Sequence, residues 1–222
     1  MGQILLVRHG QASWDAEDYD VLSETGWEQS RVLGRAFVGR GIEPRQVMLG
    51  GMRRHRETAE GCVGELAVPL ELETDPGWDE FDHVSMLAKL PAPFEGRAPS
   101  KSEFQAWFEE ATERWTGGEY DHDYNEPFSE FTGRVGESLT RLADSVGTGT
   151  AVVFTSGGPI AWACATLLAD SSDVRKDLWR RLNPVCVNSG VSRLVTGRRG
   201  LTLVSFNDHS HLDPHPDLLT YR

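Results

Sequence analysis

The sequence contains no long apolar run, few cysteines and few basic residues for its length. No stretch approaches the roughly 20 consecutive apolar residues that a membrane-spanning helix needs. The first ten residues, MGQILLVRHG, have neither the basic start nor the apolar length of a signal peptide. Leu6 also occupies the position at which a myristoylation signal needs serine or threonine. We therefore expect a cytoplasmic protein with no membrane partner.

The three cysteines, Cys62, Cys164 and Cys186, are far apart in the chain and lie among apolar residues. This count and spacing argue against a disulfide framework and against a zinc ribbon. We expect all three to be reduced thiols in the core.

Basic residues are outnumbered, since 22 Lys and Arg face 34 Asp and Glu and the net charge is -12. Such a charge works against binding to nucleic acid or to an anionic membrane. An acidic protein that binds an anionic substrate must gather its positive charge locally. The positions of the arginines are therefore informative.

Short apolar runs alternate with helical patterns along most of the 222 residues. Three runs are typical of buried strands: residues 3–8, 46–49 and 150–155. A helical pattern follows each of them, over about 25–41, 52–66 and 157–168. Two later runs, 187–195 and 201–206, flank a Gly-Arg-Arg-Gly turn and indicate a hairpin. This alternation predicts an α/β fold, a three-layer α/β/α sandwich with a mainly parallel central sheet.

The first predicted helix has signals at both of its ends. Thr25 and Glu28 have the spacing of a capping box, and Gly41 is a typical stop signal. Leu33 and Phe37 share one face of this helix and should point into the core.

The stretch from Asp82 to Phe131 interrupts the alternation. It begins with a proline-bearing loop, LPAPFEGRAPS, and continues with a helix rich in Phe and Trp. A polar loop then precedes a further helix over about 129–146. We expect a single domain over 1–222, with a helical cap inserted at about 82–131.

Arg8, His9 and Gly10 directly follow the first predicted strand. Ligands in open α/β folds bind at the carboxyl ends of the strands. A histidine at such an end can expose one ring nitrogen while the other bonds to the backbone, and this neutral imidazole is a competent nucleophile toward phosphorus. The alternative interpretation is a surface histidine beside a solvated arginine.

Three further segments could help to bind or process an anion. The segment from Arg53 to Arg56 begins a helix, where arginine side chains add to the anion-binding capacity of the helix N-terminus. The alternative interpretation is a basic, solvated helix face. Residues 78–82, WDEFD, place carboxylates beside aromatic residues. Burial against aromatics raises the pKa of a carboxyl group, as a general acid requires. The alternative interpretation of this segment is a turn with solvated acids. The Ser156–Gly158 turn offers backbone donors at a helix N-terminus.

Together these segments resemble the histidine phosphatase superfamily, also called the phosphoglycerate-mutase-like family. The matching segments run in the family's order from residue 4 to about residue 195: LLVRHGQAS, LSETGWEQSRVLG, RRHRETAE, WDEFD, VVFTSGGPIA and VNSGVSRL. The resemblance implies that His9 is phosphorylated and that Arg8 and Arg54 bind phosphate. It also implies that Glu80 is the acid, and that Ser156 and Gly157 lie at the phosphate.

Ser156 departs from the family pattern, which has a second histidine before the two glycines. A serine can donate a hydrogen bond but cannot carry positive charge. Loss of one such donor costs about 2.7–4 kcal/mol where the site depends on it, a rate factor of roughly 10² to 10³. His83 and His55 are candidates to compensate. A smaller departure is Gly50-Gly51, where the family often has Ser-Pro.

The resemblance implies a phosphomonoester hydrolase that acts on a small phosphorylated metabolite through a phosphohistidine. The alternatives are a phosphoglycerate-mutase-type phosphotransferase and a weakly active module that binds a phosphorylated ligand. The family mechanism requires no cofactor and no metal, and we expect the tail histidines His209, His211 and His215 to bind no metal. The sequence allows for a homodimer and does not identify the substrate.

Overall fold

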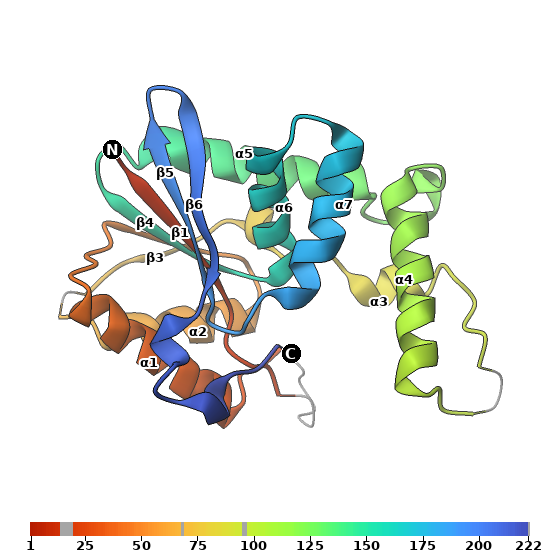
Figure 1. Cartoon of the computed structure of the whole chain (residues 1–222), viewed down its shortest axis with the longest axis horizontal. Helices are drawn as coiled ribbons and strands as arrows, with labels where there is room; N and C mark the ends of the chain where they lie inside the picture. The colour runs from red at the N-terminus through yellow and green to blue at the C-terminus, as the bar shows by residue number, and fades with distance from the viewer. Residues whose placement is uncertain (14–19, 68, 95–96, 222) are drawn as a thin grey trace. The chain divides into compact units, whose positions relative to one another are not determined.

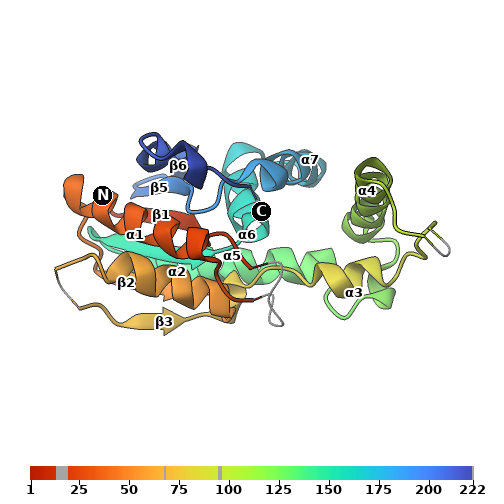
Figure 2. The same cartoon turned by 90° about the horizontal axis from the view of Figure 1, so that it is seen from below.

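The computed structural model describes residues 1–13, 20–67, 69–94 and 97–221, and six strands form one sheet in the order β3-β2-β4-β1-β5-β6 (Figures 1 and 2). The strands are β1 (Gln3–Arg8), β2 (Gln46–Leu49), β3 (Leu72–Thr74), β4 (Thr150–Thr155), β5 (Val191–Gly197) and β6 (Gly200–Asp208). The β3-β2, β2-β4 and β4-β1 pairs are parallel, whereas β5 is antiparallel to both β1 and β6. The sheet is mainly parallel, as the sequence predicts.

The chain forms two compact units, and the helix over Phe128–Ser145 begins in one of them and ends in the other. One unit comprises Met1–Glu80 with Val135–Arg222, and the other comprises Phe81–Arg134. The α-helices are α1 (Glu24–Gly39), α2 (Arg53–Val63), α3 (His83–Leu87), α4 (Lys101–Gly117), α5 (Phe128–Ser145), α6 (Gly157–Leu168) and α7 (Ser172–Leu182). Short 3-10 turns lie at Pro76–Trp78, Asp121–Asp123, Asn183–Val185, Ser210–Leu212 and Pro216–Leu218.

Helices cover both faces of the sheet, with α1 and α2 on one side and α5 and α6 on the other (Figure 1). Leu33 and Phe37 of α1 are buried in one cluster with alternate residues of β1, β2 and β4, as their shared face predicts. Each such side chain contributes about 1.5–3 kcal/mol when it is fully buried. The middle residues of β1 and β4 are buried on both faces, as expected for strands inside an α/β/α sandwich.

Two predicted boundaries are wrong. Ser23, not Thr25, caps α1, because Ser23 has an extended backbone and its Oγ accepts a hydrogen bond from the backbone N–H of Gly26 at 3.1 Å. β5 begins at Val191 rather than Val187, because the chain turns at Ser189, whose φ is +60°. The structure also contains β3 and α7, which we did not predict.

The unit Phe81–Arg134 has an aromatic centre of its own. Trp115 stacks on Phe81 at a ring-centroid distance of 4.8 Å and meets Phe128 edge-on at 5.0 Å. Its indole N–H donates to the backbone carbonyl of Glu126 at 2.8 Å, so that the buried polar atom is satisfied. The role of this unit as a cap stays a prediction.

All three cysteines are buried and unbridged, as the sequence predicts. Burial raises the pKa of the Cys164 and Cys186 thiols to about 12, so that both are neutral near pH 7. Within the described ranges, no helix combines the length and the apolar character that crossing a membrane requires.

Candidate active site

The carboxyl ends of β1 and β4 lie side by side and place the central residues of the site. Arg8 pairs with Thr155 in the sheet register, and the backbone N–H of His9 donates to the carbonyl of Thr155 at 2.8 Å. Ser156 therefore follows β4 next to the point at which His9 follows β1. β2, on the other side of β4, ends at Leu49 and leads into α2.

His9 is held with one ring nitrogen committed to the backbone. Its Nδ1–H donates to the carbonyl of Gly10 at 2.7 Å, because a carbonyl can only accept. The unprotonated nitrogen is then Nε2, which carries the lone pair. Burial, together with the charges of Arg54 and Arg8, holds the pKa of His9 well below its usual value. A neutral imidazole with a fixed tautomer meets the chemical requirement for a nucleophile.

Arg54 is the buried arginine of the predicted basic segment. It is 7% exposed, and its Nη1 lies 2.7 Å from Asp20 Oδ1. Arg53 has a side chain 57% exposed and pairs with Glu57, while the exposed Arg56 donates to Thr74. Of the three arginines, only Arg54 combines burial with an electrostatic effect on His9.

Arg8 extends from the end of β1 toward the last residues of the chain. Its Nη1 donates to the carbonyls of Cys186 and Tyr221, the latter at 2.8 Å. Its charge lowers the pKa of His9, so the guanidinium lies within electrostatic reach of that ring. Arg8 and Arg54 thus supply the local positive charge that an acidic protein needs to hold an anion.

Glu80 lies at the N-terminus of α6, beside Ser156 and Gly157. It is half-buried, and its Oε2 accepts a hydrogen bond from the backbone N–H of Gly158 at 3.1 Å. A Cβ atom at Gly157 would lie 2.6 Å from Asn183 Oδ1, so a larger residue there would displace that side chain. A carboxylate and a helix N-terminus therefore meet at this edge of the site.

His55 and Ser156 are in direct contact, although 101 positions separate them in the sequence. His55 Nε2 lies 2.8 Å from Ser156 Oγ, and the His55 and His9 ring centroids are 5.8 Å apart. Burial, with a smaller effect of Arg54, holds the pKa of His55 well below its usual value. His83, the other candidate, begins α3 in the unit Phe81–Arg134, and its role stays a prediction.

Thr58 and Asn188 brace the segment around His9. Thr58 Oγ1 accepts from the backbone N–H of Gly10 at 3.0 Å and donates to the carbonyl of Arg54 at 2.6 Å, which ties β1 to α2. The side-chain amide of Asn188 donates to the carbonyl of His9 at 3.0 Å. Both residues occur within the family-like segments, but we assigned neither of them a site role from the sequence.

Two of the three tail histidines, His209 and His211, have side-chain partners within the protein. His211 Nε2 lies 2.9 Å from Ser189 Oγ, and His209 Nδ1 donates to the carbonyl of Asn207 at 2.7 Å. In the parts of the chain that the structure describes, no three His, Cys, Asp or Glu side chains are grouped as metal ligands.

Asp20 is a site residue that the sequence did not indicate. Its carboxylate accepts from the backbone N–H of Arg53 at 2.7 Å in addition to its ion pair with Arg54. Its carboxylate thus binds both the helix N-terminus and the arginine to which a phosphate would bind. Its side chain is 33% exposed, so a ligand could displace it.

We expect Asp20→Asn to tighten phosphate binding. The change removes a negative charge that competes for Arg54 while an amide oxygen can still accept from Arg53 N–H. The inhibition constant for inorganic phosphate should fall about 3- to 10-fold, equivalent to about 0.6–1.4 kcal/mol. Asp208→Asn, which removes the same charge from a surface pair with Arg40, is the control. An equal effect of both changes would mean that net charge alone is responsible.

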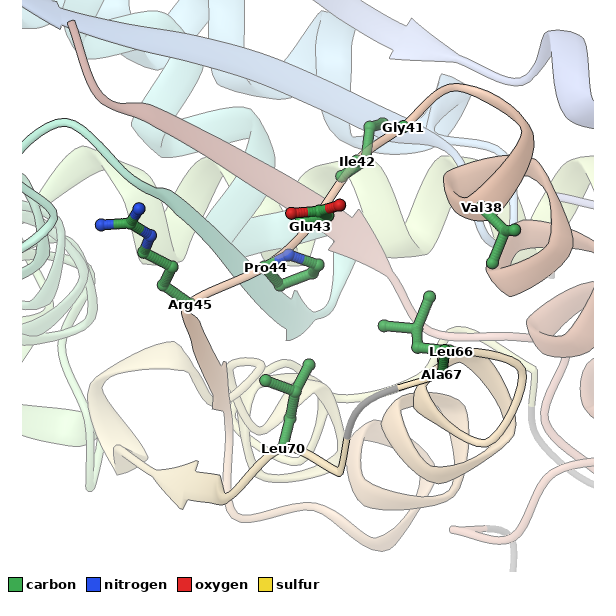
Figure 3. Close-up of a pocket in the computed structure, with 9 residues that line it drawn as sticks. All are labelled: Val38, Gly41, Ile42, Glu43, Pro44, Arg45, Leu66, Ala67 and Leu70. Atoms are coloured by element: carbon green, nitrogen blue, oxygen red, sulfur yellow. The ribbon is translucent and has the colours of Figure 1, made fainter.

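A separate pocket of about 360 Å³ lies at the amino end of β2 (Figure 3). Apolar side chains line it from the end of α1 and from the chain after α2, among them Val38, Leu66 and Leu70. The site residues follow the opposite, carboxyl ends of the strands. This pocket therefore plays no part in the candidate site.

A known protein family matches the part of the chain that contains these residues. Residues 4–209 match the histidine phosphatase superfamily, branch 1. This range contains His9, Arg8, Arg54, His55, Glu80 and Ser156. No curated protein matches the chain.

Several solved structures resemble this one at low sequence identity. YhfR from Bacillus stearothermophilus is 18% identical, with 96% of this chain and 100% of that chain covered and a TM-score of 0.69. A phosphoserine phosphatase variant from Entamoeba histolytica, in complex with phosphoserine, is 18% identical over 96% of this chain and 100% of that one, with a TM-score of 0.68. A phosphoglycerate mutase from Bacillus anthracis is 20% identical over 95% and 94%, with a TM-score of 0.65. They show that the fold is shared.

Proposed function

The chain belongs to the histidine phosphatase superfamily, and we propose that it is a phosphomonoester hydrolase that forms a phosphohistidine on His9. The observation that carries this proposal is the hydrogen bond from His9 Nδ1–H to Gly10, which leaves Nε2 as the nucleophile. The substrate is a small phosphorylated metabolite. Phosphoserine in complex with the Entamoeba histolytica protein is an example of this substrate class.

In the first step, Arg8 and Arg54 hold the phosphate and His9 Nε2 attacks phosphorus. The bond between phosphorus and the ester oxygen breaks, and Glu80 gives its proton to that oxygen. The two guanidinium groups neutralise the phosphoryl oxygens as charge redistributes in the transition state. The alcohol leaves, and the phosphoryl group remains on His9.

In the second step, the ionised Glu80 removes a proton from a water molecule, which attacks the phosphohistidine. The bond between phosphorus and Nε2 breaks, and inorganic phosphate leaves. One carboxyl group thus acts first as an acid and then as a base. The position of Glu80 at the Gly158 N–H supports this role, since it places the carboxyl group at the turn after β4.

A mutase would return the phosphoryl group to its substrate instead of transferring it to water. The resemblance to a phosphoglycerate mutase from Bacillus anthracis keeps this alternative open. We favour hydrolysis because the similar solved structures include a phosphatase in complex with its phosphorylated ligand. A weakly active binding module is the third alternative, which Ser156 motivates. Turnover of p-nitrophenyl phosphate with release of inorganic phosphate would support the hydrolase. Absence of both turnover and a phosphoenzyme would refute it.

We expect Glu80→Gln to discriminate between leaving groups. An alkoxide needs a proton from the enzyme as it departs, whereas p-nitrophenolate does not. Glycerol phosphate turnover should fall by about 10²- to 10⁴-fold, and formation of the phosphoenzyme from p-nitrophenyl phosphate should fall much less. Rapid-quench kinetics would measure both. Asp82→Asn is the matched control from the same segment, since Asp82 is the N-cap of α3 and Asn caps a helix as well as Asp does. Equal losses for both substrates would contradict the role of Glu80 as the acid.

A further inference from the structure

His55 is completely buried, yet only one of its ring nitrogens is engaged. Its exposed fraction is 0%, and its Nε2 contacts Ser156 Oγ. Among the described residues, its Nδ1 has no hydrogen-bond partner. An apolar side chain would fill the same space without an unsatisfied polar atom. The imidazole therefore has a role beyond packing.

The space for this imidazole depends on Gly50. A Cβ atom at that position would lie 2.4 Å from His55 Nδ1 and 2.7 Å from Asp79 Oδ1. Both distances are too short for any residue with a side chain. A glycine at 50, a histidine at 55 and a serine at 156 therefore form one sterically consistent set, in which the ring reaches the end of β4 from α2.

Ser156 directly follows β4, next to the point at which His9 follows β1. It is 1% exposed, and it follows Thr155, whose carbonyl accepts the backbone N–H of His9. Glu80, the proposed acid, bonds to Gly158 N–H in the same turn. Ser156 thus contacts the His55 ring and adjoins His9 at the neighbouring strand end.

The contact between His55 and Ser156 allows two tautomers with different consequences. If Nε2 carries the proton, it donates to Ser156 Oγ, and the serine proton is available for a phosphoryl oxygen. If Nδ1 carries the proton, the serine proton is committed to Nε2, and a buried N–H lacks an acceptor. Orphaned buried N–H groups are rarer than under-satisfied acceptors. The first tautomer therefore fits this site better.

We propose that Ser156 donates its hydroxyl proton to a phosphoryl oxygen and that His55 holds that hydroxyl in place, so that the pair supplies a donor in addition to the two arginines. This inference rests on the proposed phosphohistidine mechanism. Ser156 touches the phosphoryl group in this arrangement. His55 acts through Ser156 and is a positioning residue. The imidazole that a phosphohistidine site needs at the end of β4 is thereby supplied from α2.

The test is a double-mutant cycle on kcat, with a conservative variant at position 55. Ser156→Ala and His55→Ala should each lower kcat about 10²-fold, because each removes the same donor. The double variant should be no worse than either single variant, since the two residues act as a unit. His55→Gln, whose amide can donate to Ser156, should recover at least tenfold over His55→Ala.

A swap of the two positions gives a second readout. Ser156→His alone should lower kcat, because two imidazoles compete for one buried space. The same change combined with His55→Ala should give a higher kcat than either single change. His211→Ala is the matched control, since it removes another buried histidine bonded to a serine hydroxyl, at 2.9 Å from Ser189. The melting temperature of His211→Ala should fall about as much as that of His55→Ala, while its kcat stays within about twofold of the wild type.

The inference and the proposed function fail in different ways. If the wild type yields no acid-labile phosphohistidine on His9, the proposed function fails. If the wild type yields it but His55→Ala forms and hydrolyses it at unchanged rates, only this inference is overturned. Losses that multiply to about 10⁴ in the double variant would also overturn it. So would a loss in His83→Ala with none in His55→Ala.

Discussion

His9→Ala is expected to abolish phosphoryl transfer while the protein still folds. In the proposed mechanism the imidazole is the protein group that forms a bond to phosphorus, and loss of a nucleophile typically lowers kcat by about 10⁴- to 10⁶-fold. The ring is 7% exposed, so it is more buried than the sequence indicated, and its removal should cost about 1–3 kcal/mol. Steady-state assays and thermal melts followed by circular dichroism would measure both effects.

Substrate binding should survive the loss of His9. The backbone of His9 makes its bonds to Thr155 and Asn188 through N–H and C=O, which the substitution leaves in place. Arg8 and Arg54 also remain, so the dissociation constant for phosphate, measured by calorimetry, should stay within about tenfold of the wild-type value. His122→Ala, at an exposed position in the unit Phe81–Arg134, is the control. Normal turnover by folded His9→Ala would refute the assignment of the nucleophile.

The central strands could be predicted from the sequence because their signals are local. β2 and β4 have the predicted boundaries, since continuous apolar or β-branched runs are typical of strands buried between helices. β3 has only three residues, two of them exposed, so it has no apolar pattern to detect. The true cap of α1 was missed because Ser23 and Thr25 are both good caps, and the backbone conformation decides between them.

The site was only partly predictable, since its decisive contacts join distant segments. Arg8, His9 and Arg54 could be selected because each lies in a local motif. The bonds of Arg8 to Tyr221, of Arg54 to Asp20 and of His55 to Ser156 span 213, 34 and 101 positions. A single sequence contains no local signal for such pairs. It could suggest His55 as a compensating residue but could not choose it over His83.

Arg54→Lys is expected to lower kcat/KM by about 10²-fold, while Arg53→Lys leaves it within about twofold. Successive residues on a helix point about 100° apart, so only one of the two can face the phosphate. Arg54 is the buried one, and a lysine there keeps the charge but loses the planar fork that matches two phosphoryl oxygens. Each charge-assisted hydrogen bond contributes about 1.5–3 kcal/mol, which sets the size of the loss.

Arg53→Lys is a demanding control because it makes the same chemical change one residue away. Its side chain is 57% exposed and bonds to Glu57 four positions on, and surface pairs of this kind contribute about 0.3–0.5 kcal/mol. The backbone N–H that Arg53 donates to Asp20 is unchanged by the substitution. A larger loss in Arg53→Lys would mean that α2 presents a different face to the substrate, and the assignment of Arg54 to the phosphate would be wrong. A higher KM together with a lower kcat for Arg54→Lys alone would fit a guanidinium that holds the phosphate before and during transfer.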